Sequence, residues 1–294
     1  MKLLKIISLI MILSIVLIIA HIVYLYTLTP TEKFPTDIYL TSETNKTALV
    51  VVSHDDDAAM FSGTTSMLVE NGWDVNLMCF YTNKYHPEEV PIRKKEISNV
   101  SKIQHLKNLN FIDFTMRKSL ENVKKPWLPI PIAEFPENFY MDSLNKFIQN
   151  AILKYQPSVI FSLDDVIGGY GHPEHVLVGQ TVVDICKLWK DSLNFPVKKI
   201  YQNVWPESQS TKIMGDKGVY KMGKEVYKCV GMPTPDVEID ISKYADNKMD
   251  VLLAHASQQR KLKKFMPFYN YYPAGIYFSI FNKEHFRILN VRDI

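Results

Sequence analysis

Two short motifs in this 294-residue sequence bring together side chains that bind metals and carry protons. The first motif, residues 53–57, reads Ser-His-Asp-Asp-Asp and directly follows the apolar run 47–52. Three consecutive carboxylates repel one another at neutral pH, and a bound cation relieves that repulsion. Aspartate is also a preferred residue at the N-cap of a helix. Because one aspartate is enough for a cap, three of them beside a histidine favour a metal site.

The second motif, residues 168–175, reads Gly-Gly-Tyr-Gly-His-Pro-Glu-His and follows another apolar run, 158–162. Two histidines three positions apart can lie on one face of a helix and approach the same ligand. Alone, this spacing is a weak signal, because histidines are common in cores and on surfaces. Together with the first motif it is stronger, since ligands bind beyond the carboxyl ends of the strands of a parallel sheet.

One histidine and one aspartate from the first motif, with one histidine from the second, make a three-ligand set of nitrogen and oxygen atoms. Such a set leaves a fourth position for water, as in catalytic rather than structural zinc sites. Zinc in such a site activates water and polarises a carbonyl group. A spare carboxylate is a candidate general base, and the remaining histidine can stabilise charge on the carbonyl oxygen and the leaving amine. Fe²⁺ or another divalent ion is an alternative to Zn²⁺.

The elements that must position these motifs follow from apolar periodicity and turn residues. We expect strands at 47–53, 74–81, 109–114, 158–162 and 198–204, and helices at 58–71, 91–106, 141–155, 175–188 and 248–263. We expect long irregular stretches at 117–138 and 206–235, both with several prolines. Strands that alternate with helices predict an α/β fold with a mainly parallel sheet and helices on both faces.

The N-terminus predicts one transmembrane helix ahead of this domain. Residues 6–26 are almost wholly apolar, and a run of roughly 20 such residues spans the hydrocarbon core of a bilayer. A cleaved signal peptide is the alternative, but the run is longer than usual and lacks a small-residue cleavage site. We expect an anchor at 1–28, a linker at 29–45 and one domain at 46–294. The few flanking charges favour a cytoplasmic N-terminus with the domain outside the cytoplasm.

Composition excludes several other classes of protein. The formal net charge is +3, and the single basic cluster, 260–264, is too short to predict a nucleic-acid partner. Three scattered cysteines without a C-x-x-C pair argue against a disulfide framework and a thiolate zinc site.

On its first motif the chain resembles the PIG-L/LmbE-like deacetylases, which include N-acetylglucosaminylphosphatidylinositol de-N-acetylase. Members generally carry (A/P)-H-P-D-D-E after the first strand, and residues 53–58 stand here as Ser-His-Asp-Asp-Asp-Ala. The resemblance implies a Rossmann-like fold, with His54 and Asp57 as metal ligands and Asp56 as the general base.

The later family motif, H-P-(D/N)-H, stands here as His-Pro-Glu-His at 172–175. The resemblance implies that His175 is the third metal ligand and that His172 assists the tetrahedral intermediate. It also implies that Tyr170 is the mobile tyrosine that helps orient the substrate carbonyl.

Two further segments match the family, and the resemblance covers roughly residues 46–263. Residues 93–96 resemble an R-x-x-E segment, and residues 248–258 resemble a late K-x(6)-H-x-(S/T)-Q segment. Arg93 is a candidate to bind a phosphate or carboxylate of the substrate; the alternative is a pair with Glu96 on a solvated helix. His255 is expected to hold the last helix to the site.

Two positions depart from the family pattern. Asp55 stands where the family has proline, and Ala58 stands where it has glutamate. Neither position is a ligand, so the metal set is intact, but Asp55 becomes an alternative candidate for the base. The missing glutamate removes a contact that can tune a metal ligand.

The resemblance therefore implies a zinc-dependent hydrolase that removes the N-acetyl group of an N-acetylglucosamine-type glycoconjugate. The predicted anchor favours a substrate close to a membrane, such as a glycolipid. Two alternatives stay open. One is the N-acetylglucosaminylphosphatidylinositol deacetylase of the GPI pathway, facing the cytoplasm. The other is a non-catalytic, membrane-tethered sugar-binding module with a degenerate site.

Overall fold

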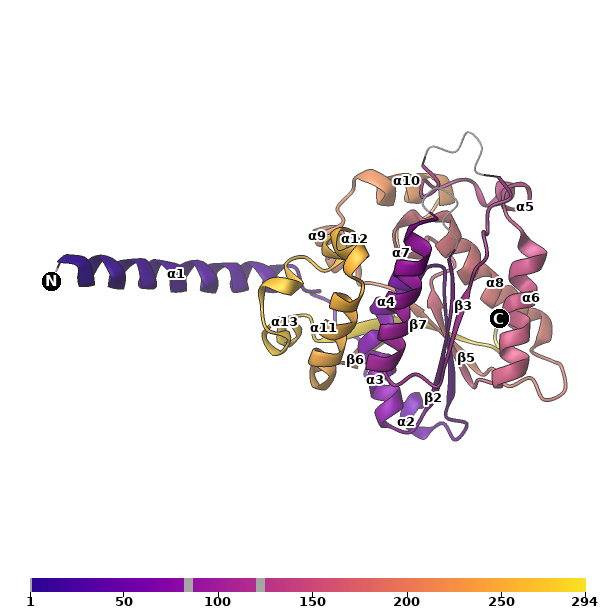
Figure 1. Ribbon diagram of the computed structural model, residues 1–294. Helices are drawn as coiled ribbons and strands as arrows, with labels where there is room; N and C mark the ends of the chain where they lie inside the picture. The colour runs from indigo at the N-terminus through magenta and orange to yellow at the C-terminus, as the bar shows by residue number, and fades with distance from the viewer. Residues whose placement is uncertain (1, 82–86, 120–124) are drawn as a thin grey trace.

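The protein is built around a seven-stranded sheet with helices on both faces (Figure 1). The structure, a computed structural model, describes residues 2–81, 87–119 and 125–294. The strand order is β3-β2-β1-β4-β5-β7-β6. The strands are β1 Thr47–Val52, β2 Asp74–Phe80, β3 Asn108–Ile112, β4 Val159–Leu163, β5 Lys199–Asn203, β6 Val237–Asp240 and β7 Lys283–Asn290.

The first five strands are parallel, and the last two pair antiparallel at one side of the sheet. The prediction of a mixed α/β fold with a mostly parallel sheet is therefore confirmed. Strands β6 and β7 were not expected from the sequence. β7 is half-polar and lies between β5 and β6, so its run of residues lacks the continuous apolar pattern of a central parallel strand.

Most of the chain outside the sheet is helical. The helices are α1 Lys2–Thr27, α2 Tyr39–Ser42, α3 Ser62–Glu70, α4 Glu89–Ile103, α5 Phe135–Asn138, α6 Met141–Tyr155, α7 Gly168–Gly171, α8 Pro173–Trp189, α9 Glu207–Ile213, α10 Gly218–Tyr227, α11 Ala245–Ala254, α12 Gln259–Phe265 and α13 Ala274–Ile280. Short 3₁₀ turns are η1 Asp55–Phe61, η2 Ile132–Glu134, η3 Ser242–Tyr244, η4 Ala256–Gln258 and η5 Tyr269–Tyr271.

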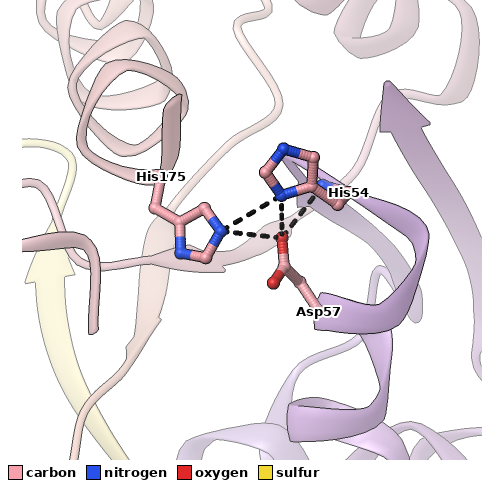
Figure 2. A group of neighbouring side chains, drawn as sticks. All are labelled: His54, Asp57 and His175. Atoms are coloured by element: carbon pink, nitrogen blue, oxygen red, sulfur yellow. Dashed lines mark hydrogen bonds and ion pairs between the residues drawn. The ribbon is translucent and has the colours of Figure 1, made fainter. Parts of the chain in front are cut away.

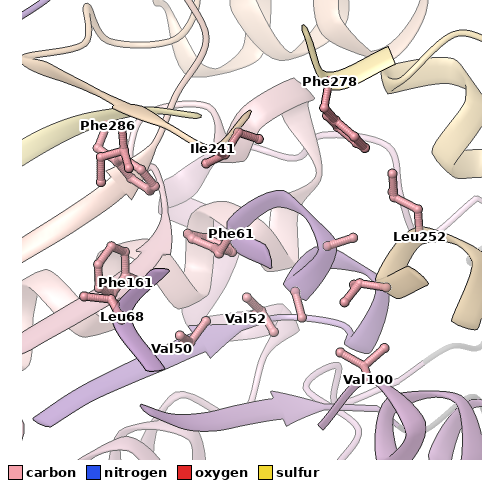
Figure 3. Close-up of a cluster of buried hydrophobic side chains, with 14 of the residues drawn as sticks. Val50, Val52, Phe61, Leu68, Val100, Phe161, Ile241, Leu252, Phe278 and Phe286 are labelled. Atoms are coloured by element: carbon pink, nitrogen blue, oxygen red, sulfur yellow. The ribbon is translucent and has the colours of Figure 1, made fainter. Parts of the chain in front are cut away.

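Strand β1 shows why the sheet is covered on both sides. Successive side chains of a strand point to opposite faces. Val50 and Val52 belong to the cluster that α3, α4, α11 and α13 build on one face (Figure 3). Leu49 and Val51 belong to the cluster that α6 and α8 build on the other face. A strand buried on both faces is continuously apolar, which is how the sequence identified it.

Several predicted elements differ from the structure. The predicted helix 248–263 is two helices, α11 and α12, separated by the turn η4. The irregular stretch predicted at 206–235 contains α9 and α10, so that prediction is wrong. The stretch predicted at 117–138 ends with η2 and α5, and its residues 120–124 lie outside the described residues.

Helix α1 extends away from the domain as a single rod (Figure 1). It is long and apolar enough to cross a membrane, a test that signal sequences also pass. The predicted linker at 29–45 is folded onto the domain rather than free. Thr36 bridges to Glu238 of β6, Leu40 is buried, and Lys198 binds the carboxylate of Glu43. The segment has a linker-like composition, but tertiary contacts hold it on the domain.

Candidate metal centre

The two motifs meet where the direction of chain progression along the sheet reverses. β1 and β4 are neighbouring parallel strands, while β2 and β3 continue on one side and β5 on the other. Such a switch point opens a crevice beyond the carboxyl ends of the strands. Ser53, at the end of β1, donates its hydroxyl hydrogen to the carbonyl of Glu174 at 2.9 Å. This bond ties the first motif directly to the second.

His54, Asp57 and His175 point toward one another from the two motifs (Figure 2). Nδ1 of His54 lies 3.2 Å from Nε2 of His175 and 3.4 Å from Oδ2 of Asp57. The same carboxylate oxygen lies 3.3 Å from Nε2 of His175. Ligand atoms at ~2.0–2.2 Å from a tetrahedral zinc lie about 3.3–3.5 Å apart. The three atoms therefore have the spacing of one face of a zinc tetrahedron.

The outward nitrogen of each histidine is held so that the inward one is free to ligate. Nδ1 of His175 lies 3.0 Å from the carbonyl oxygen of Gly168, which can only accept a hydrogen. Nε2 of His54 lies 2.8 Å from a carboxylate oxygen of Glu174. Hydrogen bonds of this kind fix the tautomer of a ligand and increase its basicity. These residues consequently fit a divalent metal by donor type, spacing and orientation.

Without a metal, the carboxylates around His54 favour a proton on its ring. Burial would lower the pKa of His54, but hydrogen bonds to Asp57 and Glu174 outweigh it and raise that pKa to about 10. For His175, burial outweighs the charge of Asp57, so its pKa is lowered. One imidazolium and one neutral imidazole can share the 3.2 Å hydrogen bond. A metal that binds here must displace that proton.

Asp56, the predicted general base, is held by Arg93. The guanidinium nitrogen Nη2 of Arg93 lies 2.6 Å from Oδ1 of Asp56 and also pairs with Asp55. Burial would raise the pKa of Asp56, but the charge of Arg93 outweighs it, and the pKa is lowered. The Asp56 carboxylate is therefore ionised throughout the neutral range.

Arg93 itself is only 3% exposed, with the ring of Tyr81 4.1 Å from its guanidinium carbon. The alternative of a solvated pair with Glu96 is wrong, because both residues are buried and Glu96 binds elsewhere. Its predicted contact with substrate stays a prediction. In the structure, Arg93 lies behind the carboxylate of Asp56, the predicted general base.

Asp55 is fully buried and is not among the three atoms that converge as metal ligands. It pairs with Arg93 and lies 3.6 Å from Nδ1 of His255, which is fully buried too. With Glu96 these residues form a second group of possible ligands. Arg93 already supplies a cation to Asp55, so this group is better described as a buried charge network behind Asp56.

The two weaker family matches pack against each other. Glu96 of the R-x-x-E segment accepts hydrogen bonds from the backbone and hydroxyl of Ser257 at 2.7 and 2.8 Å. His255 lies two residues before Ser257 and contacts Asp55. Its expected role of holding the late helices to the site agrees with these contacts.

His172 is poised as a neutral hydrogen-bond donor. Its Nδ1 accepts the backbone N–H of Glu174 at 3.2 Å, so the ring proton lies on Nε2. Burial and then the neighbouring positive groups lower its pKa well below the ordinary value. The ring stacks on His175 with centroids 4.6 Å apart.

Tyr170 lies over the two histidines of its motif. Its ring centroid is 5.2 Å from that of His175 and 4.9 Å from that of Phe265. Its three glycine neighbours all have positive φ: 58° at Gly168, 76° at Gly169 and 105° at Gly171. Residues with a Cβ rarely adopt this conformation. At Gly168 a Cβ would also come within 2.5 Å of the Cβ of His175.

Asp164 holds this glycine loop. Its fully buried carboxylate accepts hydrogen bonds from four consecutive backbone N–H groups, those of residues 166–169, at 2.6–3.1 Å. The bonds satisfy donors that would otherwise be buried without a partner. Asp164 thus positions both Tyr170 and the carbonyl that orients His175.

The helix that follows the first motif is capped from the far end of the chain. Glu284 of β7 accepts the backbone N–H groups of Gly63 and Thr64, at the start of α3, at 2.9 and 2.8 Å. The ammonium group of Lys248 pairs with the same carboxylate. Both side chains are buried, with 4% exposure each. A carboxylate at a helix N-terminus is favoured by the helix dipole.

Sequence reasoning missed three of these residues as parts of the site: Glu174, Asp164 and Glu284. Glu174 stood inside the second motif, and its carboxylate between two histidines was the available signal. Asp164 was noticed only as part of an acidic loop. Nothing in its local sequence could have identified Glu284, because the backbone N–H groups that it caps are more than 200 residues away.

Comparison with known proteins supports the family resemblance. Residues 49–186 match the sequence model of the family described as PIG-L, GlcNAc-PI de-N-acetylase. The chain is 28% identical over 141 residues to the 1D-myo-inositol 2-acetamido-2-deoxy-alpha-D-glucopyranoside deacetylase of Acidothermus cellulolyticus. That match covers 44% of this chain and 46% of the relative, so the chain matches about half of the relative's length. The resemblance inferred from the two motifs is confirmed.

Solved structures share the fold at low sequence identity. The N,N'-diacetylchitobiose deacetylase from Pyrococcus horikoshii has a TM-score of 0.51 and 17% identity, covering 87% of this chain and 90% of that one. The 4-carboxy-2-hydroxymuconate hydratase from Pseudomonas putida KT2440 has a TM-score of 0.53 and 14% identity, covering 83% of this chain and 96% of that one. Since a hydratase and a deacetylase share it, the fold alone does not decide the reaction.

Proposed function

We propose that the chain removes the N-acetyl group of an N-acetylglucosamine-type glycoconjugate, since residues 49–186 match the PIG-L family model. His54, Asp57 and His175 would hold a divalent metal, for which Zn²⁺ is the leading candidate. The observation that carries the proposal is the convergence of three ligand atoms at 3.2–3.4 Å from one another. Fe²⁺ would suit the same nitrogen and oxygen donors.

The residues around these ligands have the parts needed for amide hydrolysis. A bound metal would supply Lewis acidity, which activates water and polarises a carbonyl. The ionised carboxylate of Asp56 accepts a proton from the attacking water as a C–O bond forms at the acetyl carbon. Nε2–H of His172 donates to the charge that develops on the carbonyl oxygen. Breaking the C–N bond with protonation of the nitrogen gives acetate and a free amine.

Tyr170 is proposed to orient the substrate carbonyl. Burial first, and then the neighbouring carboxylates, raise the pKa of its hydroxyl well above the ordinary value. The hydroxyl is therefore a neutral donor at any physiological pH. Arg93 is proposed to align Asp56, with which it pairs. Binding of an anionic group of the substrate by Arg93 is the second proposal for this residue.

The substrate class rests on the proteins that this chain is similar to. The Acidothermus relative deacetylates an acetamido-deoxyglucopyranoside of inositol, and the Pyrococcus enzyme deacetylates diacetylchitobiose. Both substrates contain an N-acetylated glucosamine. We propose the same acetamido sugar for this chain, with a carrier close to a membrane.

Membrane association is proposed from α1, with its N-terminus in the cytoplasm and the domain outside. The competing proposal is the GPI-pathway deacetylase, for which the domain would face the cytoplasm. Reporter fusions at the C-terminus separate the two: an active periplasmic or extracellular reporter supports the first, and a cytoplasmic reporter the second.

The decisive test is release of acetate from N-acetylglucosamine conjugates by the full chain in detergent. We expect release that stops on chelation and returns on addition of Zn²⁺. Asp56→Asn should keep its metal while kcat falls by about 10²–10⁴, the usual worth of a general base. If the variant stays active, Asp55 is the better candidate.

His175→Ala provides the matching metal test. It should abolish tight metal binding; full zinc occupancy by elemental analysis would contradict its role as a ligand. A protein that binds N-acetylglucosamine conjugates, holds metal and releases no acetate from any of them would instead be the non-catalytic sugar-binding module.

A further inference from the structure

The anchor helix is joined rigidly to the domain through its last turns. Ile22 and Leu25 of α1 pack into the main core cluster, and Leu25 is fully buried. His21 makes a 2.5 Å hydrogen bond to the hydroxyl of Tyr272, and its ring meets Phe268 edge-on at 4.6 Å. Because the segment after α1 is also held on the domain, no flexible tether separates the two.

The length of exposed helix sets where the domain would lie relative to a bilayer. Residues 2–20 of α1 are exposed. At 1.5 Å per residue they span about 28 Å, close to the ~30 Å hydrocarbon core. Once this rod crosses a bilayer, the surface around its base must lie at the headgroup layer. Residues 259–276, which contact α1 through Phe268 and Tyr272, form part of that surface, and α9 contacts the chain just after α1.

The composition of residues 259–276 suits an anionic interface. The segment has no Asp or Glu, and α12 carries four exposed cations: Arg260, Lys261, Lys263 and Lys264. Within the described parts of the chain, none of the four forms an ion pair. Tyr271 is 68% exposed and Ile276 is 43% exposed beside them. Aromatic rings favour the interface, and cations favour anionic lipid headgroups.

We propose that residues 259–276 form a bilayer-contact surface, in which the cations of α12 bind anionic phospholipid headgroups while Tyr271 and Ile276 enter the interface. The inference rests on the proposed membrane crossing of α1. It extends that proposal, because a transmembrane helix alone does not require the domain to touch lipid.

This surface adjoins the candidate metal centre. Phe265, the last residue of α12, packs on Tyr170 and lies 6.2 Å, ring to ring, from Trp205. Contact between α12 and headgroups would therefore hold the site at the level where the sugar of a glycolipid lies.

The test uses tryptophan as a probe in the full chain reconstituted in vesicles. Tyr271→Trp places the probe on the proposed surface. Leu153→Trp places it at a position that is 57% exposed on α6, on the side of the domain away from α1 (Figure 1). Vesicles contain phosphatidylcholine brominated in its acyl chains, with or without phosphatidylglycerol. Quenching is measured relative to the parent protein, which has four tryptophans.

We expect Tyr271→Trp to be quenched at least about twice as strongly as Leu153→Trp, and more with phosphatidylglycerol present. Replacing Lys263 and Lys264 by Gln in the Tyr271→Trp background should remove about half of the increase due to phosphatidylglycerol. The matched control, Gln at Lys146 and Lys154 of α6, removes the same charge and should change nothing. Equal quenching of the two probes would overturn the contact surface. Headgroup binding would be overturned if quenching changed neither on addition of phosphatidylglycerol nor on replacement of either lysine pair.

These outcomes are separable from failure of the proposed function. Acetate release is measured on the same preparations with a water-soluble conjugate, so an inactive protein with strong quenching leaves the contact surface standing. Protein that alkaline carbonate strips from the vesicles would show that α1 does not cross the bilayer. In that case the premise fails, and the inference fails with it.

Discussion

Glu174 offers the sharpest test of how the metal ligands are held. Its carboxylate lies 2.8 Å from Nε2 of His54 and is 17% exposed. Losing such a support typically costs about 10–100-fold in metal affinity. Glu174→Gln keeps an acceptor but loses the charge, and a charge-assisted hydrogen bond is roughly twice as strong as a neutral one. We therefore expect about a tenfold loss for Gln and close to 100-fold for Glu174→Leu, which keeps neither.

A proton competes with the metal for His54, and this competition changes the apparent loss of metal affinity in the Glu174 variants. Glu174 also stabilises the proton that His54 carries without metal, since it helps to raise the pKa of His54 to about 10. Removing Glu174 weakens this competitor, so the apparent loss of metal affinity should be smaller at neutral pH than near pH 10.

The assay is competition for Zn²⁺ against a chromophoric chelator, at several pH values, with thermal unfolding as a check on the fold. Glu225→Gln on α10, an exposed glutamate, is the matched control and should bind metal as the parent does. If Glu174→Leu keeps its affinity within about twofold at every pH, His54 does not depend on this carboxylate and the reasoning is refuted.

Three further predictions concern protons and stability. Zn²⁺ binding should release about one proton from His54, so the logarithm of the Zn²⁺ affinity should rise by about one unit per pH unit from neutral pH towards 10. Calorimetry in buffers of different ionisation enthalpy measures the number of protons released. Zn²⁺ binding without proton release at pH 8 would contradict the prediction. Asp164→Ala leaves four backbone donors without their acceptor and should lower the free energy of unfolding by about 2–4 kcal/mol in denaturant titrations, whereas the exposed control Asp191→Ala should stay within about 0.5 kcal/mol. For Glu43, burial opposes ionisation, but hydrogen bonds from Lys198 and Tyr39 lower its pKa to about 2. Because the pKa of Glu43 is lower in the folded state than in the unfolded state, its ionised carboxylate stabilises the fold above pH ~4.5, and this stabilisation is lost as pH falls towards 2. We expect it to contribute about 1–3 kcal/mol to the free energy of unfolding, since solvent screens the half-exposed Lys198. The melting-temperature gap between the parent and Glu43→Gln should narrow from pH 6 to pH 3, and a constant gap would contradict the assignment.

The parallel half of the fold could be predicted because its signals are local. The strand at 47–52 is apolar at nearly every position, and the helix at 141–155 was predicted with the ends that the structure shows. The helices α9 and α10 were missed because prolines and glycines around them suggested loops. β7 was missed because its partner strands are set by tertiary packing, and its half-polar pattern does not mark a buried strand.

The site divides in the same way. The convergence of His54, Asp57 and His175 could be expected because each motif follows a recognisable strand and parallel topology brings strand ends together. Their selection as the ligands came from the family resemblance. The partners of Arg93 could not be predicted, because a helix surface pattern does not reveal that a buried arginine neutralises Asp55 and Asp56. Their pairing depends on how α4 packs beside η1, which the sequence around Arg93 does not encode.

The cap that Glu284 places on α3 has a consequence for biogenesis. The carboxylate and the N–H of Gly63 that it accepts are 221 residues apart in the chain. While a ribosome is still producing β7, the helix that follows His54 and Asp57 lacks its anionic cap, and Lys248 lacks its counter-charge. Loading with metal would then be delayed until β7 has been made, after both ligand motifs have left the exit tunnel.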